Sequence, residues 1–292
     1  ATADLVAICR RLDGIPLALE LAASHLRVMT MSEVVESLED PLTLAGRQRT
    51  RSHHRTLRDT MQWSYDLLDP RNQAVFDRLS IFAGSFSRTA ALAVGSRSDG
   101  GEQALAELVD VSMLQADVSG EATRYRMLPI LRDFGRFNLQ EEGEIEPVRR
   151  DHAQYLAAEV ADMNLPFVLM GSNPRIEENA SIDDFRAAAD WALDNGLEQL
   201  AVDVLVPLGQ VWVRRLDEVC RWMKSLDRSD PPRDMKRWRL DMSAAIAEWL
   251  SGRDHEALAL LPRLIESAHA LGEPYAAAEA MWASGNIHWR QG

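Results

Sequence analysis

The sequence predicts a mainly α-helical chain with one small β-hairpin and a series of helical hairpins in its last third. Three observations lead to this fold class. Apolar residues recur at three- and four-residue spacing through most of the sequence, which is the period of a helix buried along one face. Residues 112–128 show two short extended segments around a polar turn, and "AGSF" at 83–86 is expected to be a turn with one short extended stretch. The last third carries a weak internal repeat.

Three short helices are expected first, over residues 4–11, 16–27 and 32–38. Pro16 is compatible with a helix because it opens the second one, where its missing N–H costs nothing. Ser32 is a candidate N-cap for the third helix, and Pro41 closes that segment.

The next segment has the pattern of a winged helix, a variant of helix-turn-helix. Asp69 and Pro70 are typical of a helix start, as is Ser87. Pro129 ends the hairpin and precedes a closing helix. Three helices followed by a two-stranded wing define this outline. The expected helices cover residues 56–68, 70–82, 87–94, 102–113 and 130–140.

Beyond residue 143 the sequence consists of helices separated by short breaks. Helices are expected over residues 148–163, 181–194, 197–216 and 217–226. The segments "EWLSG", ending at Gly252, and "HWRQG", ending at Gly292, stand 40 residues apart around "ALALLPRLIESAHALGEP". Paired helices at this period predict a tetratricopeptide-like (TPR-like) solenoid. The abrupt start and end suggest a fragment of a longer protein.

Length, composition and charge restrict the function. The 292 residues are enough for two or three domains, and 46% of them are hydrophobic. No apolar run approaches the ~18 residues of a membrane span and the N-terminus lacks a signal-peptide pattern, so a cytoplasmic protein without membrane contact is expected. Cys9 and Cys220 are expected to be buried, reduced thiols. The net charge of −13 repels polyanions.

Basic residues concentrate only in the arginine-rich segment Gly46–Arg58. The segment is either a solvated linker or a loop that faces phosphate or an acidic partner, and the sequence leaves both open. His53 and His54 are adjacent and therefore point in different directions, so no metal site is expected. The helix around Glu102, Glu107 and Asp110 carries no Lys or Arg. We therefore expect no direct nucleic-acid binding by the wing module.

The sequence lacks the motifs of common enzymes, and no catalytic residue is assigned. It contains no G-x-x-x-x-G-K-[ST] loop, no G-x-S-x-G and no H-E-x-x-H. The paired acids at Glu177 and Asp183 stand at helix starts, where carboxylates favour the helix dipole. Seven of the eight tryptophans fall in the repeat region. They are expected mainly to pack between helices, and a groove lined by some of them for a peptide or small effector stays open as the alternative.

Four stretches, in order, resemble the C-terminal half of the nucleotide-binding module of STAND-class regulators: "CRRLDGIPLALELAASHLR", "TLRDTMQWSYDLLDPRNQAVFDRLSIFAGSF", "LVDVSMLQ" and "RYRMLPILRDFGRFNLQEEGE". The match is closest to bacterial LuxR-type or antibiotic-regulator-type transcription factors, which resemble NB-ARC proteins. The resemblance covers residues 3–165. It implies the end of an ARC helical subdomain at 1–52, a winged helix at 53–142 and truncated TPR-like repeats at 143–292.

The resemblance also implies a nucleotide site. In the family a G-[LI]-P-L turn contacts the adenine, which here corresponds to Pro16, flanked by Gly14 and Leu17. The family's Met-His-Asp motif, whose histidine reaches the β-phosphate of ADP, falls on Met127, Leu128 and Pro129. Leucine has no donor for phosphate, so Arg126 or Arg132 is the candidate substitute.

The implied function is that of a regulatory fragment. An effector, a small molecule or a protein, acts on the helical repeats and is coupled to ADP/ATP-controlled activation and self-association. ATP or ADP is expected in the full-length protein, whose P-loop and output domains are missing here, and no cofactor in this fragment alone. Two alternatives remain: a nucleotide-independent helical interaction scaffold, and the regulatory region of a multidomain enzyme such as a nucleotide cyclase.

Overall fold

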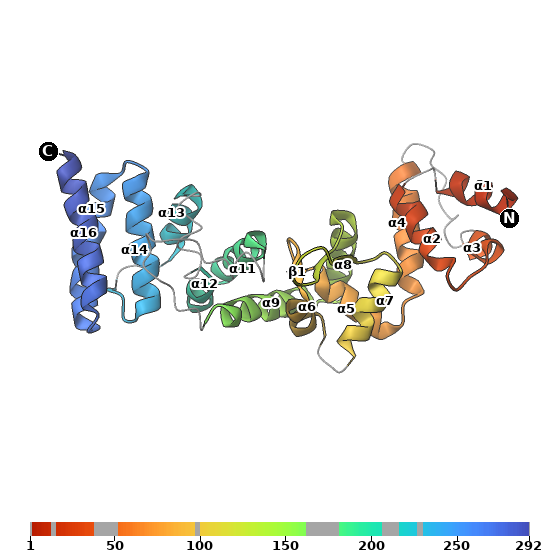
Figure 1. Cartoon of the computed structure of the whole chain (residues 1–292), viewed down its shortest axis with the longest axis horizontal. Helices are drawn as coiled ribbons and strands as arrows, with labels where there is room; N and C mark the ends of the chain where they lie inside the picture. Colours follow the sequence, from red (N-terminus) through yellow and green to blue (C-terminus); the bar gives the residue numbers. More distant parts are fainter. Residues whose placement is uncertain are drawn as a thin grey trace. The chain divides into compact units, whose positions relative to one another are not determined.

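The computed structural model describes residues 2–12, 16–37, 52–96, 100–161, 181–205, 216–226 and 230–291 (Figure 1). It confirms the mainly α-helical fold class with a winged helix and helical repeats. The chain divides into two compact units, Ala1–Val148 and Arg149–Gly292. The domain boundaries expected from the sequence stay predictions.

Three helices begin the first unit: α1 (Thr2–Arg11), α2 (Pro16–His25) and α3 (Met31–Ser37). They enclose a small apolar cluster of Ile8, Leu12, Ala18, Ala22 and Val34.

The predicted cap of α3 was wrong, because Thr30 takes the place expected for Ser32. Thr30 Oγ1 accepts from the Glu33 backbone N–H, and Glu33 Oε2 accepts from the Thr30 backbone N–H at 2.6 Å. This reciprocal capping box satisfies two donors at the helix start.

Helix α4 (Ser52–Asp66) starts four residues earlier than predicted, inside the arginine-rich segment. It packs against α2. At its centre the Arg58 guanidinium lies over the Phe137 ring, 4.9 Å from the centroid. Residues 46–51 of the arginine-rich segment lie outside the described residues, so its phosphate contact stays open.

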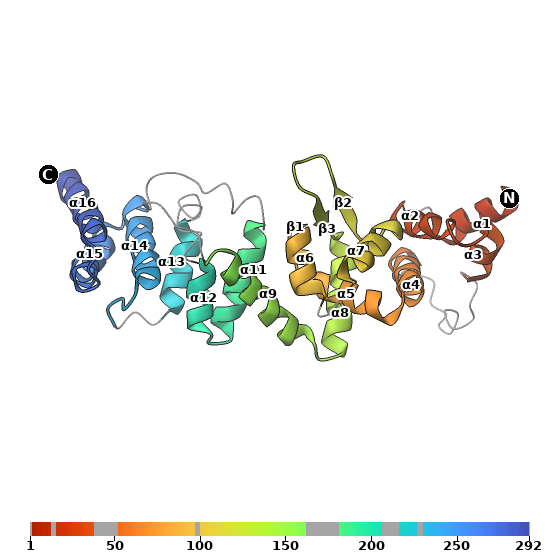
Figure 2. The same cartoon turned by 60° about the horizontal axis from the view of Figure 1, so that its bottom comes forward.

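The winged helix follows in the predicted order. It contains α5 (Pro70–Leu79), β1 (Phe86–Ser87), α6 (Arg88–Gly95), α7 (Gly101–Asp110), β2 (Gln115–Asp117), β3 (Arg124–Arg126) and α8 (Pro129–Glu141). Asp69 and Ser87 cap α5 and α6 through their side-chain oxygens, as predicted. The strands form an antiparallel sheet of order β1-β3-β2 (Figure 2). Strand β1 extends the predicted hairpin to three strands.

Aromatic rings fill the core of the winged helix. Phe76 of α5 and Phe134 of α8 both meet Tyr65, at centroid distances of 5.8 and 5.5 Å. Phe82 stacks on Phe86 of β1, with their ring centroids 4.2 Å apart. Helix α5 ends at Leu79, with Ser80 as its C-cap, instead of continuing to residue 82 as predicted.

Helix α9 (Ile145–Glu159) leads into the second unit, which continues with α11 (Ile182–Asp194), α12 (Glu198–Leu205) and α13 (Leu216–Ser225). Their apolar faces share one cluster that includes Phe185, Trp191 and Trp222. The helix predicted over 197–216 ends at Leu205, and residues 206–215 lie outside the described part of the chain.

The last helices are α14 (Met235–Leu250), α15 (Asp254–Ala270) and α16 (Pro274–Gln291). Helix α15 packs against both α14 and α16 (Figure 1). This arrangement corresponds to the 40-residue repeat of the sequence, with α14 and α16 as equivalent helices. Trp238 is buried between α14 and α15, where its Nε1 donates to the Leu264 carbonyl at 2.8 Å.

Both cysteines are free thiols. Cys220 is buried as predicted, whereas Cys9 is exposed on α1, so that half of the prediction was wrong. Ile8 of α1 and Leu12, the residue directly after the helix, are buried in the apolar cluster. Cys9 follows Ile8 directly and therefore faces away from the cluster.

Candidate functional site

A groove of about 760 Å³ lies in the first unit between α2, the end of α7 and the wing. Glu20 contributes from α2, and Val109 and Ser112 contribute from α7 and the turn after it. The remaining lining residues are Ser85, Leu114, Gln115, Ala116, Asp117, Arg124, Tyr125 and Arg126. The groove therefore joins the N-terminal helices to the sheet of the winged helix.

Two arginines of β3 give this groove its donors. Arg124 and Arg126 are two residues apart in a strand, so they share one face of the sheet. Arg124 Nη2 donates to Ser85 O at 2.7 Å, and Arg126 Nη2 donates to Gln115 Oε1 at 3.0 Å. These bonds fix both guanidinium groups, the kind of group that suits a carboxylate or phosphate.

Two carboxylates balance the arginines in the groove. Asp117 accepts from the Ser119 hydroxyl and backbone N–H, and these hydrogen bonds hold the pKa of Asp117 below its usual value. Glu20 of α2 is the second carboxylate that lines the groove. With two formal charges of each sign, the groove suits a polar ligand that combines donors and acceptors.

Two sequence-predicted site residues lie at the start of α2. Pro16 is its first residue and is exposed, and Leu17 is half-buried. Pro16 and Glu20 are four residues apart, which places them on the same helix face one turn apart. Gly14 lies outside the described residues.

The other predicted residues surround the start of α8. Met127 is buried in the core, and Leu128 occupies the N-cap position of α8. The Arg132 guanidinium donates to the Ala83 carbonyl, so it holds the loop between α5 and β1. These three residues do not line the groove, whereas the neighbouring Arg126 does. Their assignment to a nucleotide site stays a prediction.

All three acids of α7 bind neighbouring elements. Glu102 pairs with Arg88 at the start of α6, and Asp110 accepts from Arg27 Nη1 at 2.7 Å. Glu107 accepts from Asn72 of α5. Helix α7 is thereby tied to α5, to α6 and to the segment after α2.

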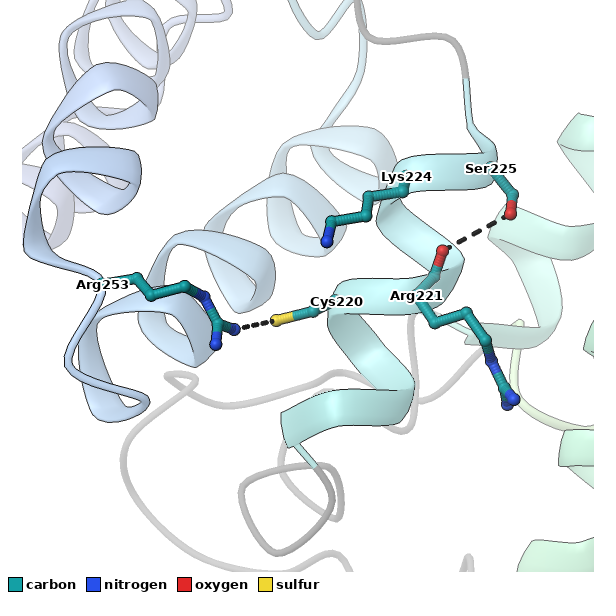
Figure 3. A pocket seen from close by; sticks show the side chains of 5 residues that line it. All are labelled: Cys220, Arg221, Lys224, Ser225 and Arg253. Atoms are coloured by element: carbon teal, nitrogen blue, oxygen red, sulfur yellow. Dashed lines mark hydrogen bonds between the residues drawn. The ribbon is translucent and has the colours of Figure 1, made fainter.

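The second unit contains a separate pocket of about 440 Å³ (Figure 3). It is lined by Cys220, Arg221, Lys224, Ser225 and Arg253. Arg253 points at Cys220, with Nη2 2.9 Å from Sγ, and also pairs with Glu248. Burial and the Glu248 carboxylate raise the pKa of the Cys220 thiol, so it remains protonated at neutral pH.

The sequence indicated this basic pocket only weakly. Arg221 and Lys224 stand three residues apart, which places them on one face of α13. Arg253 lies in the turn before α15, and only tertiary packing brings it close to Arg221 and Lys224 of α13. In the described part of the chain, no group of three or more His, Cys, Asp or Glu side chains is arranged to hold a metal ion. Nor does any described helix combine the length and hydrophobicity that crossing a bilayer requires.

Comparison with known protein families identifies the domain formed by residues 68–140. Residues 68–140 match the family model of the winged helix-turn-helix domain. This match spans α5 to α8, the same elements that form the three helices and the wing described above. Residues 68–140 therefore form a winged helix-turn-helix domain.

Similarity to bacterial regulators extends over almost the whole chain. The chain is 31% identical to the Mycobacterium tuberculosis (strain H37Rv) protein named "Putative HTH-type transcriptional regulator Rv0890c", over 95% of this chain and 33% of that protein. It is 35% identical to "Uncharacterized protein Rv0894" of the same organism, over 51% of this chain and 40% of that protein. The chain thus spans about a third of the first relative's length. The predicted resemblance to bacterial transcriptional regulators is confirmed.

One solved structure covers 93% of the chain, with a TM-score of 0.44 and 13% identity. It is a Signal Transduction ATPase with Numerous Domains (STAND) protein with a tetratricopeptide repeat sensor, from Pyrococcus horikoshii, and 41% of that chain is covered.

Proposed function

We propose that this chain is the regulatory part of a nucleotide-switched transcriptional regulator of the STAND type. The observation that supports it most is the similarity, over 95% of the chain, to a longer protein named as an HTH-type transcriptional regulator. In this proposal the protein is cytoplasmic and the chain is not itself an enzyme. The ATPase core and the output domain belong to the longer protein.

The nucleotide, ADP or ATP, would contact α2 and the wing of the winged helix. Pro16 would offer a flat apolar contact for the adenine, since its ring carries no N–H. The groove beside it presents Arg124 and Arg126, whose guanidinium donors suit phosphate oxygens. Arg126 is the better candidate than Arg132, because Arg132 is held by the Ala83 carbonyl. The fragment alone lacks a phosphate-cradling loop and should not hold nucleotide stably.

The effector would act on the second unit. The pocket at Arg221, Lys224 and Arg253 presents basic side chains in a strongly acidic chain, which favours an anionic small molecule or an acidic peptide. To activate the protein, the effector must bind its active state more tightly than its inactive state.

A pair of proline variants tests the nucleotide contact. Pro16 and Pro70 both open helices in the first unit and both are exposed. In the full-length protein, Pro16→Ala should weaken ADP binding by about tenfold, equivalent to ~1.4 kcal/mol, whereas Pro70→Ala should leave the affinity unchanged. Equal ADP affinity of the two variants in equilibrium dialysis would overturn the adenine contact.

The nucleic-acid prediction has its own test. The winged helix-turn-helix match favours DNA contact, while the acids of α7 oppose it. We expect this chain to leave duplex DNA unshifted in a gel assay at low salt. A shift that weakens steeply with salt would instead assign a phosphate-binding surface to the winged helix.

A scaffold function is the second candidate, because apolar side chains are exposed on α16. It predicts partner binding by the second unit that is insensitive to nucleotide in the full-length protein. The regulatory region of a nucleotide cyclase would respond like the first proposal but with a catalytic output, which an assay of cyclic nucleotide formation distinguishes.

A further inference from the structure

Helix α16 is apolar on two opposite faces. Its inner face, with Ala276, Ala280, Ala283 and Ile287, is buried against α15 and α14. Its outer face carries four large exposed side chains: Tyr275 at 78%, Met281 at 49%, Trp282 at 50% and Trp289 at 85% exposure. A helix that is hydrophobic all round is normally buried on all sides.

The outer face has a regular spacing, and we call it the α16 stripe: Tyr275, Ala278, Trp282, Gly285 and Trp289. The aromatic residues recur every seven positions, with small residues between them at the same period. This alternation of large and small side chains is the pattern of a helix–helix seam, in which knobs of each helix fill holes of the other. A side chain built at Gly285 would meet nothing within 4 Å, so the hole is open.

The equivalent helix shows what such a stripe binds. Trp238, Met242 and Ala245 of α14 stand 40 residues before Ala278, Trp282 and Gly285. All three are buried in one cluster with the apolar face of α15. That face consists of Ala257, Leu261, Leu264 and Ala268.

We propose that the α16 stripe binds a further amphipathic helix of the α15 type, supplied by the same repeat array. Its contact face would carry Ala and Leu at the spacing i, i+4, i+7 and i+11, as α15 does. Within the unit, Trp282 of the stripe already meets Trp249 of α14 edge-on at 6.0 Å. A repeat helix is the occupant favoured over a second copy, because α15 already packs on the equivalent face of α14.

A labelled peptide with the α15 sequence, residues 254–270, is the probe. Fluorescence anisotropy would measure the binding of this peptide to the 292-residue chain and to two Ala→Glu variants of the chain. Ala278 is exposed on the α16 stripe, and Ala259 is exposed on α15 away from it. A carboxylate inside an apolar seam is costly, so Ala278→Glu should weaken binding by about tenfold or more, and Ala259→Glu should change it less than about twofold.

Other outcomes would overturn the proposal. They are unsaturable peptide binding, equal affinity of both variants, or a dimer of the chain that Ala278→Glu dissociates in sedimentation equilibrium. The last result would assign the stripe to a second copy. Circular dichroism of each variant separates a docking effect from misfolding. The test is independent of nucleotide, so its failure leaves the proposed switch untouched.

Discussion

The Tyr65 hydroxyl donates to Asp77 Oδ2 at 2.5 Å inside the winged-helix core. Asn138 Nδ2 donates to the other oxygen at 2.9 Å, so one carboxyl joins α4, α5 and α8. Burial raises the pKa of Asp77 to about 7, although both hydrogen bonds favour its charged form. This carboxyl therefore titrates near neutrality in the folded protein.

Because its pKa is raised in the fold, Asp77 should make the folded protein less stable as the pH rises. Its pKa is 3.8 before burial and about 7 in the fold, so between these values the folded chain binds the extra proton. The free energy of unfolding should fall as pH rises through this window, by at most about 4 kcal/mol from this group. Urea unfolding of the first unit at pH 4 to 8 measures it. Asp77→Asn should flatten the profile, and parallel profiles of the two proteins would contradict the assignment.

His25 should have the opposite effect: its contribution to the stability of the fold should be lost as the pH falls. It is buried, 3.3 Å from Ser64 Oγ and 4.7 Å from the Trp63 ring centre, and this burial lowers the pKa of His25 below 6.5. Its contribution to stability is complete above pH 6.5 and is lost as pH falls, because the buried ring must then charge. His25→Gln should reduce this acid sensitivity in urea unfolding. The exposed His255→Gln is the control, and an equal effect of both substitutions would refute the prediction.

Two helical glycines should respond oppositely to alanine. A Cβ at Gly135 would lie 2.8 Å from Ser80 Cβ and 3.3 Å from Phe76, so Gly135→Ala should destabilise the packing of α8 on α5 by about 1–2 kcal/mol. At Gly285 the space is open, and Gly285→Ala should stabilise by ~0.5–1 kcal/mol through helix propensity. Thermal unfolding measures both shifts. A change of the unfolding temperature in the same direction for both variants would contradict the close packing described at Gly135 and the open space at Gly285.

The tryptophans of the repeat region should differ sharply in their effect on stability. Trp238→Phe removes the hydrogen bond to the Leu264 carbonyl and leaves a gap between α14 and α15, which should cost about 1–3 kcal/mol. Trp289→Phe changes a largely exposed side chain and should stay within about 0.5 kcal/mol. Urea unfolding of the two variants checks the contrast. A similar cost for both would place Trp289 in a packed environment.

Local signals explain what could be predicted from the sequence. The caps at Asp69 and Ser87 were predicted because a capping side chain acts on backbone groups two or three residues away. The cap at Thr30 was missed although its partner Glu33 is three residues on, the spacing of a capping box. Strand β1 overlaps the predicted turn and short extended stretch "AGSF" only at Phe86, because two residues have no detectable period and their extended form depends on pairing with β3.

Tertiary contacts explain what could not be predicted. Glu20 and Arg126 line one groove although about a hundred residues separate them in the sequence. Periodicity likewise marks Trp222 and Trp289 as helix positions of the same kind, yet one is buried and the other exposed. The difference depends on which neighbouring helix is present, which the helix's own residues do not encode.

The three acids of α7 have a consequence for how this domain can evolve. A winged helix gains a DNA-reading surface most simply by acquiring basic side chains on this helix. Here each replacement of Glu102, Glu107 or Asp110 by a basic residue would break a tether to Arg88, Asn72 or Arg27 and set like charges together at two of these sites. A change of charge on α7 would therefore also alter the contacts of this helix with its neighbouring elements.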